Sequence, residues 1–283
     1  MACTGYNYRM PTIRRAAIDF GITNTDVLVE TDGALRHWMR PSRGVPDGVR
    51  VAAVLAEGGV ALTDVEALAA TGGRSRELPD HLGSTRVTRV GEMAAIGRGG
   101  QIAAGNEAEP LLVVSCGSGT AAVAARGADY AHVSGTAVGG GTLQGLGRLL
   151  LGTADPRAID ALAAKGDRNG VDLALGDVVG AGIGLLHADT TAVNFGRIGR
   201  EAFEPGRADI AAGLVTLVGQ TIGLIAINAA RAQSINRILL IGRLLDLPTL
   251  QDAILKVGGL YAVTLDVAPN PGYVTALGAL YHL

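Results

Sequence analysis

The sequence is poor in cysteine, in lysine and in runs of one charge. Its two cysteines, Cys3 and Cys116, are too few for the disulfide framework of a small secreted domain. Lys165 and Lys256 are the only lysines among the 24 cationic residues, and no Lys/Arg-rich run occurs. With a formal net charge of -2, the chain lacks the positive patch that binds nucleic acids and anionic membranes. We therefore expect neither as a partner, and we expect Cys116, which lies in an apolar run, to be a buried and inert thiol.

The sequence also lacks signals for export and for membrane insertion. The first dozen residues contain no continuous apolar segment after a basic start, so no secretory signal is expected. The apolar stretch 214–230 contains Gln220 and Asn228, and it is shorter and more polar than a membrane-spanning helix needs. These features indicate a globular, soluble protein with a cytoplasmic location.

Several catalytic motifs are nearly present but incomplete. Residues 115–119 read Ser-Cys-Gly-Ser-Gly, and a nucleophile elbow on Ser118 would need a glycine where Cys116 stands. Residues 139–147 lack the Gly-Lys-Ser/Thr ending of a P-loop, and 180–184 do not satisfy the dinucleotide fingerprint. The histidines have no metal-ligand spacing, which disfavours a zinc site. They are His37, His81, His132, His187 and His282.

What the sequence does contain begins with a hairpin at residues 16–30. An apolar run at 16–20 and a second at 27–30 bracket turn residues, which is the signature of two antiparallel strands. Asp19 stands near the end of the first strand, where its carboxylate is suited to a hydrated Mg²⁺. The turn offers backbone N–H groups and hydroxyls to a phosphate, through Gly21, Thr23, Asn24 and Thr25. The alternative is a plain hairpin in which Asp19 only caps the turn.

The rest of the first hundred residues reads as a small α/β segment. Apolar spacing and turn residues predict a strand at 35–39, a helix at 46–58 and a strand at 65–70 that runs into a Gly-Gly pair. Helical spacing through Val87, Val90 and Ile96 predicts a helix within 78–98 that carries Glu92. The small, polar stretch 101–110 is the expected boundary between two lobes.

A second hairpin then repeats the first. Residues 111–125 read strand, turn and strand, with Gly117, Ser118 and Gly119 in the turn. Two hairpins of one kind, roughly ninety residues apart and each opening an α/β segment, suggest a duplicated fold with a cleft between its lobes. We therefore expect an α/β protein with an N-terminal lobe at 1–105 and a C-terminal lobe at 106–283.

Two further glycine-marked junctions follow in the second lobe. Gly139, Gly140 and Gly141 precede Thr142, the expected N-cap of an apolar helix that Gly152 ends, and the free N–H groups at this helix start favour an anion. The strand expected at 237–242 ends in Gly242, as at a nucleotide-binding strand-to-helix turn. The other elements expected are helices at 158–164, 210–232, 246–258 and 272–283 and a strand at 261–267.

At this point the sequence resembles the type II pantothenate kinases, a branch of the superfamily of sugar kinases, actin and heat-shock chaperones. The most specific match is Gly-Thr-x-x-Gly-Gly-Gly-Thr-x-x-Gly-Leu within residues 133–152. Shorter matches fall at 112–119, 163–167, 194–196, 214–225 and 272–279. The resemblance implies two actin-like (ribonuclease H-like) lobes closing on Mg-ATP and a pantothenate pocket beside the γ-phosphate. It also implies a homodimer and suggests acyl-coenzyme A as a feedback ligand.

The resemblance also implies roles for individual residues. Asp19 matches the aspartate that holds Mg²⁺ and phosphate, and Glu92, in Val90-Gly-Glu-Met93, falls where the family keeps its catalytic glutamate. Ser118 and His132 fall on the substrate side. The nucleotide-binding positions of the family match the first turn (Gly21, Thr23, Asn24, Thr25), the second turn (Gly117, Ser118, Gly119), the loop (Gly139, Gly140, Gly141, Thr142) and Gly242 on the adenosine side.

Four departures from the family pattern concern the acceptor side and the first turn. His132 replaces an arginine that contacts the acyl substrate, and neutral histidine cannot make the bidentate, permanently charged contact of arginine. Asp26 replaces a lysine, Ile22 replaces a glycine and Ala121 replaces a small hydroxyl residue. Three functions therefore stay open: a pantothenate kinase, a kinase of another small hydroxylated metabolite, and a nucleotide-binding regulatory protein without transfer activity.

Overall fold

The computed structural model describes residues 14–184, 186–200 and 204–283. The loose leader expected at 1–13, with Cys3, lies outside these residues. The chain divides into two compact units, Met1–Gly91 with Ala279–Leu283 and Glu92–Gly278. The division falls before helix α2 (Glu92–Ala104), earlier than the 105/106 boundary expected from the sequence, because α2 packs on the sheet of the second unit.

The first unit is built on a six-stranded mixed sheet in the order β3-β2-β1-β4-β6-β5. Strands β1 and β2 form the expected antiparallel hairpin, and β4 lies parallel to β1 on its other side. Helix α1 (Gly48–Glu57) begins after Asp47, whose side chain accepts a hydrogen bond from the Arg50 N–H group. The strands are β1 (Arg14–Phe20), β2 (Asn24–Thr31), β3 (Ala34–Pro41), β4 (Ala67–Thr71), β5 (His81–Leu82) and β6 (Thr85–Arg89).

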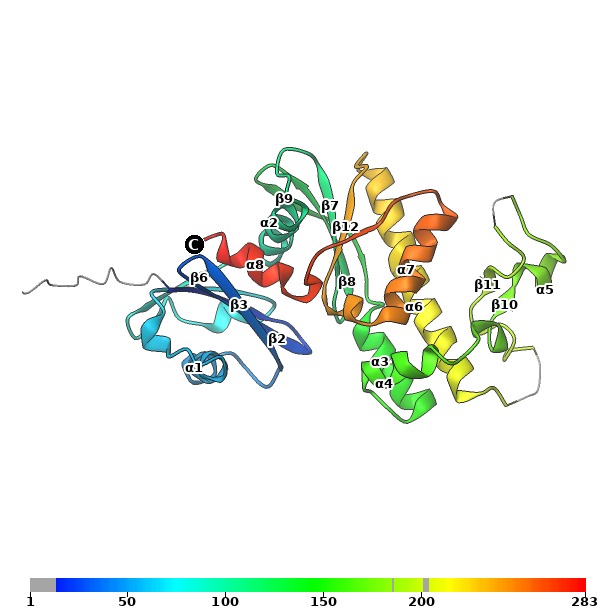
Figure 1. The fold of residues 1–283 in the computed structure, drawn as a ribbon, viewed down its shortest axis with the longest axis horizontal. Coiled ribbons are helices and arrows are strands. Elements are labelled where there is room, and N and C mark those ends of the chain that lie inside the picture. The colour runs from blue at the N-terminus through cyan, green and yellow to red at the C-terminus, as the bar shows by residue number, and fades with distance from the viewer. Residues whose placement is uncertain (1–13, 185, 201–203) are drawn as a thin grey trace, which may run out of the picture. The chain divides into compact units, whose positions relative to one another are not determined.

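Strand alternation decides which side chains of β1 reach the core. Ile18 and Phe20 belong to one buried cluster with Val51 and Leu55 of α1. Figure 1 shows α1 beside the strands of this unit. Successive residues of a strand point to opposite faces, so Asp19 lies on the other face of the sheet. The carboxylate therefore stands outside the hydrophobic core of this unit, two residues before the turn.

The second unit has a five-stranded sheet in the order β13-β12-β7-β8-β9. Helix α2 covers one face, and the long helix α6 with α3, α4 and α7 covers the other (Figure 1). The strands are β7 (Leu111–Cys116), β8 (Thr120–Arg126), β9 (Asp129–Thr136), β12 (Ile238–Ile241) and β13 (Asp266–Val267), with β10 (Leu173–Ala174) and β11 (Thr191–Val193) in a separate pair. The other helices are α3 (Gly140–Leu151), α4 (Pro156–Ala163), α5 (Leu175–Val179), α6 (Arg207–Ala232), α7 (Pro248–Leu260) and α8 (Val274–Leu280).

Helix α6 is the longest helix of the described chain, as expected. Its most apolar 18-residue window has a mean hydropathy of 2.1, and the helix is 26 residues long, so it would be able to cross a membrane by length and composition alone. The expectation that this stretch is too short and too polar is therefore wrong. However, 61% of the apolar window is buried inside the protein, and its leucine, valine and isoleucine side chains belong to the core around β7 and β12. Helix α6 therefore packs as a core helix of this unit.

Two secondary-structure expectations are wrong. Val87 lies in strand β6, where it alternates with exposed Arg86, and the helix that carries Glu92 begins only at Glu92. A short alternating strand followed at once by a helix leaves an apolar spacing that mimics one continuous helix. The strand expected at 261–267 shrinks to β13, because the chain turns at Ala262, which has a positive φ of 52°.

A buried carboxylate organises the segment between β10 and β11. Asp172 is fully buried and accepts hydrogen bonds from the Phe195 N–H group at 2.8 Å, the Thr191 hydroxyl at 3.1 Å and the Asn194 amide at 3.4 Å. Burial raises the pKa of Asp172 above its ordinary value of 3.8, and these hydrogen bonds and Arg168 offset only part of the rise.

The raised pKa of Asp172 predicts a pH-dependent contribution to stability. In the unfolded chain Asp172 loses its proton near its ordinary pKa, whereas the folded protein keeps the proton to higher pH. The free energy of unfolding therefore falls as pH rises between the two pKa values. In Asp172→Asn this titration is missing. Urea unfolding from about pH 4 to about pH 6 should show the wild-type free energy falling relative to that of the variant, and a difference that rises with pH would contradict the raised pKa.

Candidate functional site

The first hairpin turn is held in a fixed shape by backbone and hydroxyl groups. Phe20 pairs with Thr25 across the hairpin, so the turn is short, and a Cβ at Gly21 would lie 2.7 Å from the Asn24 carbonyl oxygen. Such a contact excludes a side chain at Gly21 without rearrangement. The hairpin itself is confirmed, and the roles of Gly21, Thr23, Asn24 and Thr25 toward phosphate stay predictions.

Ser42 is a turn residue that the sequence reasoning missed. Its backbone N–H donates to the Thr23 carbonyl at 2.8 Å, its hydroxyl donates to the Gly21 carbonyl at 2.7 Å, and it lies 3.0 Å from the Thr25 hydroxyl. Strand β3 returns antiparallel beside β2, which brings the residue after β3 back to the turn. A small hydroxyl residue directly after the third strand was the signal available in the sequence.

Asp19 faces a second carboxylate and an unpartnered hydroxyl. In the sheet register Asp19 pairs with Asp26 of β2 on one side and with Thr71 of β4 on the other, so the three side chains share one face. Directly opposite Cβ atoms lie about 4.5–5.5 Å apart. The Thr71 hydroxyl is fully buried and has no hydrogen-bond partner in the described structure, and a Cβ at Gly72 would lie 2.7 Å from Asp19 Oδ1. Oxygen donors of this kind suit a hard divalent cation.

The second hairpin turn and the glycine loop are joined through their backbones. The N–H group of Gly140 donates to the Gly117 carbonyl at 2.9 Å, and that of Gly141 donates to the Ser118 carbonyl at 2.8 Å. A Cβ at Gly139 would lie 2.8 Å from the Ser118 carbonyl oxygen. The structure therefore brings together two segments that the sequence placed twenty residues apart on the chain.

These same bonds correct two expectations about the start of α3. The N–H groups of Gly140 and Gly141 are not free for an anion, because the carbonyls of the neighbouring turn accept them. Thr142 is not the N-cap. Gly139 occupies that position, and the Thr142 hydroxyl accepts from the Gly139 N–H at 3.3 Å while donating to the Ala137 carbonyl at 3.2 Å. The end of the helix at Gly152, in the left-handed conformation, is as expected.

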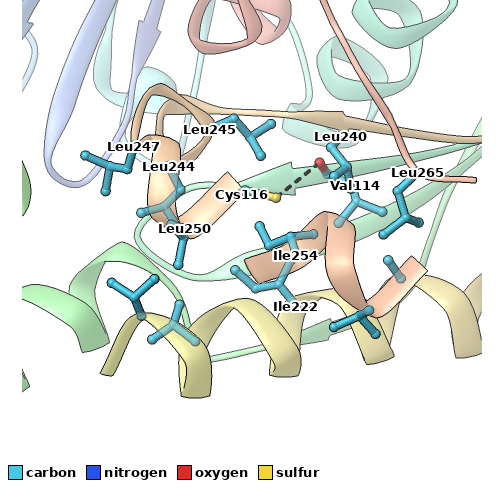
Figure 2. Packing of buried hydrophobic residues seen from close by; sticks show 14 of the residues in the cluster. Val114, Cys116, Ile222, Leu240, Leu244, Leu245, Leu247, Leu250, Ile254 and Leu265 are labelled. Carbon is cyan, nitrogen blue, oxygen red and sulfur yellow. Dashed lines mark hydrogen bonds between the residues drawn. The ribbon is translucent and has the colours of Figure 1, made fainter. Parts of the chain in front are cut away.

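Gly242, directly after β12, lies against the backbone of the second hairpin at Cys116. It has a φ of 104°, and a Cβ there would lie 2.4 Å from the Cys116 carbonyl oxygen. Cys116 is fully buried with Leu240, Leu244 and Ile254 around it, and its thiol faces the Val114 carbonyl (Figure 2). Burial raises the pKa of the Cys116 thiol to about 12. The expectation of a buried, inert thiol is confirmed.

Helix α2 runs along strand β9. A Cβ at Gly97 would lie 2.2 Å from the Tyr130 ring, and four residues later Gln101 donates to the Gly127 carbonyl at 2.8 Å. Later residues of the helix thus meet earlier residues of the strand. The N-terminus of α2 points toward the later residues of β9.

This direction brings Glu92 toward His132. From Gly97 back to Glu92 the helix covers about 7.5 Å, which equals about two strand residues and leads from Tyr130 to His132. Both side chains are exposed, and His132 lies on the edge strand of its sheet. As the first residue of α2, Glu92 also favours the positive end of the helix dipole, a structural role that needs no substrate.

The described residues contain no cluster of side chains that would hold a metal ion by protein ligands alone. Within residues 14–184, 186–200 and 204–283, no three His, Cys, Asp or Glu side chains gather closely enough to hold one. Mg²⁺ in phosphoryl-transfer enzymes needs fewer protein ligands, since one or two carboxylates, water and the substrate phosphates complete its shell. Asp19 and Asp26 satisfy that smaller requirement.

Known proteins match this arrangement in sequence. The family profile Fumble matches residues 98–258, which include the second hairpin, the glycine loop and Gly242. A type II pantothenate kinase of Oceanobacillus iheyensis is 32% identical over 215 residues, which cover 74% of this chain and 79% of that protein. The chain belongs to the Fumble family of type II pantothenate kinases. The resemblance drawn from the residue patterns is thereby confirmed.

Solved structures extend the match to the fold of this Fumble-family chain. Component A of (R)-2-hydroxyglutaryl-CoA dehydratase from Acidaminococcus fermentans has a TM-score of 0.65 at 16% identity, over 95% of this chain and 97% of that one. A ROK family glucokinase from Streptomyces griseus, solved with glucose and AMPPNP, has a TM-score of 0.62 at 14% identity, over 95% and 98%. The expected α/β fold of the actin-like class is confirmed.

The contact between Gly242 and Cys116 predicts a large cost for a side chain at Gly242. Gly242→Ala forces a strained φ and a clash with backbone, so it should lower the free energy of unfolding by about 3 kcal/mol. Gly127→Ala is the matched control, because Gly127 also has a positive φ but nothing lies within 4 Å of its Cβ position, and it should lose only about 1 kcal/mol. Equal losses in urea unfolding would show that the close contact carries no energy.

Proposed function

We propose that the protein transfers the γ-phosphoryl group of Mg-ATP to pantothenate and forms 4'-phosphopantothenate, the first step of coenzyme A biosynthesis. The observation that carries this proposal is the 32% identity over 215 residues to a protein named type II pantothenate kinase. The described geometry supports it, because both glycine-hydroxyl hairpins of the family pattern form and the second is bonded to the glycine loop.

Phosphate binding is assigned to the turns that the backbone holds in shape. One turn contains Gly21, Thr23, Asn24 and Thr25. Ser42 holds this turn in place by donating hydrogen bonds to the Gly21 and Thr23 carbonyls. Gly117, Ser118 and Gly119 form the other, with Gly139 to Thr142 and Gly242 packed against it. Phosphoryl transfer depends mainly on positioning and charge stabilisation, which such rigid turns supply.

The residues around Asp19 fit Mg²⁺. Asp19 and Asp26 lie directly opposite each other in the sheet register and offer carboxylate oxygens on one face. The unpartnered Thr71 hydroxyl adds an oxygen beside Asp19. When bound with ATP, Mg²⁺ neutralises the negative charge of the phosphates. Asp26 thereby acts as a second cation ligand, which removes the difficulty that a carboxylate near the turn would repel phosphate.

Glu92 is the proposed acceptor of the proton from the hydroxyl of the substrate. Glu92 is exposed at the N-terminus of α2, the end of the helix that runs toward His132, the residue assigned to the substrate side. Proton transfer to a positioned carboxylate contributes typically about 10²–10⁴-fold to a rate. Ser118, in the second turn, is the other residue assigned to the substrate.

Assembly, regulation and location belong to the same proposal. A homodimer, an acyl-coenzyme A feedback ligand and a cytoplasmic location are what the family resemblance implies for this chain. Small-molecule phosphorylation requires neither a nucleic acid nor a membrane as a partner.

One observation favours a second candidate function, a kinase of another small hydroxylated metabolite. His132 stands exposed on edge strand β9, where the family pattern has an arginine toward the acyl substrate. Replacing a fixed positive charge by imidazole changes what an acceptor site can hold. The nucleotide apparatus would be the same in both cases.

The role of Glu92 is tested by its conservative variant. Glu92→Gln removes the proton acceptor but little volume, so release of ADP in the presence of pantothenate should fall about 10²-fold or more while Mg-ATP still binds. Glu109→Gln is the control, because Glu109 is also exposed but lies in the loop after α2. Turnover in Glu92→Gln equal to that of the control would remove Glu92 from the mechanism.

His132→Arg distinguishes the two candidate functions. If His132 weakens an acceptor contact that arginine makes, the variant should raise turnover with pantothenate, by about tenfold for one recovered charge-assisted hydrogen bond. His81→Arg adds the same charge to an exposed position in β5 and should leave the rate unchanged. No gain in His132→Arg over His81→Arg would mean that His132 does not contact the acceptor.

A further inference from the structure

Three arginines line a small hollow beside the first hairpin turn. The hollow has a volume of ≈ 30 Å³, and all the residues around it belong to the first unit. The residues that line it include two of the turn, the serine that hydrogen-bonds to the turn, and three arginines. They are Gly21, Thr25, Ser42, Arg43, Arg50 and Arg74. One water molecule needs about 10–15 Å³ on this measure, so the hollow has room for a small polar group larger than a single water.

Two of the three arginines that line the hollow form no ion pair with the residues that the structure describes. Arg74 has one carboxylate partner, Glu77, at 3.5 Å. Arg43 and Arg50 have no carboxylate within 4.0 Å in the part of the chain that the structure describes. The nearby Asp47 accepts the backbone N–H of Arg50 at 2.8 Å and so serves as the cap of helix α1. Of the three arginines that line the hollow, only Arg74 has a carboxylate partner among the described residues.

The hollow lies at the edge of the sheet where ligands bind in open α/β folds. It is lined by Phe20 and Gly21, at the carboxyl end of β1, and by Arg74, three residues after the parallel strand β4. Ligands bind outside the carboxyl ends of such strands. Thr25 pairs with Phe20 and therefore shares the face that α1 covers, whereas Asp19 lies on the opposite face. The arginines are consequently separate from the proposed Mg²⁺ ligands.

The local backbone leaves room for one of the guanidinium groups. A Cβ at Gly44 would lie 2.8 Å from Arg50 Nη2 and 3.2 Å from Arg50 Cζ. Any larger residue would displace the Arg50 side chain from where it lies. Ser42 precedes Gly44 by two residues, and its hydroxyl donates to the Gly21 carbonyl and lies within hydrogen-bond distance of the Thr25 hydroxyl.

We propose that Arg43, Arg50 and Arg74 form a binding site for a small oxyanion, the phosphate or carboxylate group at one end of a ligand. Guanidinium groups match the oxygen atoms of both groups through paired N–H donors. The oxyanion comes from either of two sources, a phosphate or the carboxylate of an acceptor molecule. The inference does not depend on the proposed function.

Binding to purified variants tests this site without requiring turnover. The test variant is Arg43→Gln/Arg50→Gln, and Arg86→Gln is the control, since Arg86 is exposed on β6 and does not line the hollow. Titration calorimetry is carried out with inorganic phosphate, ATP, pantothenate and pantothenol, which lacks the carboxylate. Thermal unfolding without ligand establishes that the variants fold, and Arg43→Gln alone, at an exposed position, replaces the double variant if that one does not.

The expected result is a dissociation constant that rises about tenfold or more in the test variant for at least one oxyanion and is unchanged in the control. Weakened binding of phosphate and ATP, with pantothenate unaffected, identifies a phosphate as the source. Weakened binding of pantothenate, with pantothenol unaffected, identifies the carboxylate. Equal affinities in the test variant and the wild type, or no binding of any probe to the wild type, would overturn the proposal.

Failure of the kinase proposal is distinguishable from failure of the oxyanion site. A wild-type protein that releases no ADP with pantothenate, yet loses oxyanion binding in the test variant, keeps the site and refutes the activity. A protein that turns over pantothenate but binds all probes equally in both forms keeps the activity and refutes the site.

Discussion

Close approach of backbone to backbone at the second hairpin is the constraint on which the C-terminal unit depends. The turn at 117–119 accepts the N–H groups at the start of α3, and Gly242 lies against the Cys116 carbonyl from the end of β12. No side chain fits at Gly139 or Gly242 without displacing main-chain atoms. Beneath these contacts the strands and helices bury the large hydrophobic core, so the turn rests on a rigid base. Within this unit, the backbone contacts therefore fix the turn at 117–119, the glycine loop at 139–142 and Gly242 relative to one another.

The sequence allowed much of this arrangement to be predicted, because glycine and hydroxyl clusters after apolar runs have few structural meanings. Both hairpins, α1, α6 and the end of α3 at Gly152 follow from such local signals. Partners that are distant in sequence could not be predicted. The carbonyls of Gly117 and Ser118 accept hydrogen bonds from the Gly140 and Gly141 N–H groups, which we had expected to be free. The N-cap is Gly139 and not Thr142. Val87 looked helical because a short strand and the following helix share one apolar spacing.

The acceptor side and the first turn are where this chain departs most from its family. Asp26 lies directly opposite Asp19 in the sheet register, so the two carboxylates share one face of the sheet. Nearly all cations of the chain are arginines, so the presence of arginine alone carries little information. The position of Arg43 and Arg50, at the carboxyl edge of the sheet without carboxylate partners, is what distinguishes them.

The most direct test of the central claim is identification of the product. The purified protein is incubated with Mg-ATP and pantothenate, and the mixture is analysed by mass spectrometry and phosphorus NMR. The account predicts a product carrying one added phosphoryl group as a monoester, formed only when both Mg²⁺ and ATP are present. Unchanged pantothenate, recovered from a folded protein that binds Mg-ATP, would contradict the claim that this chain is a pantothenate kinase.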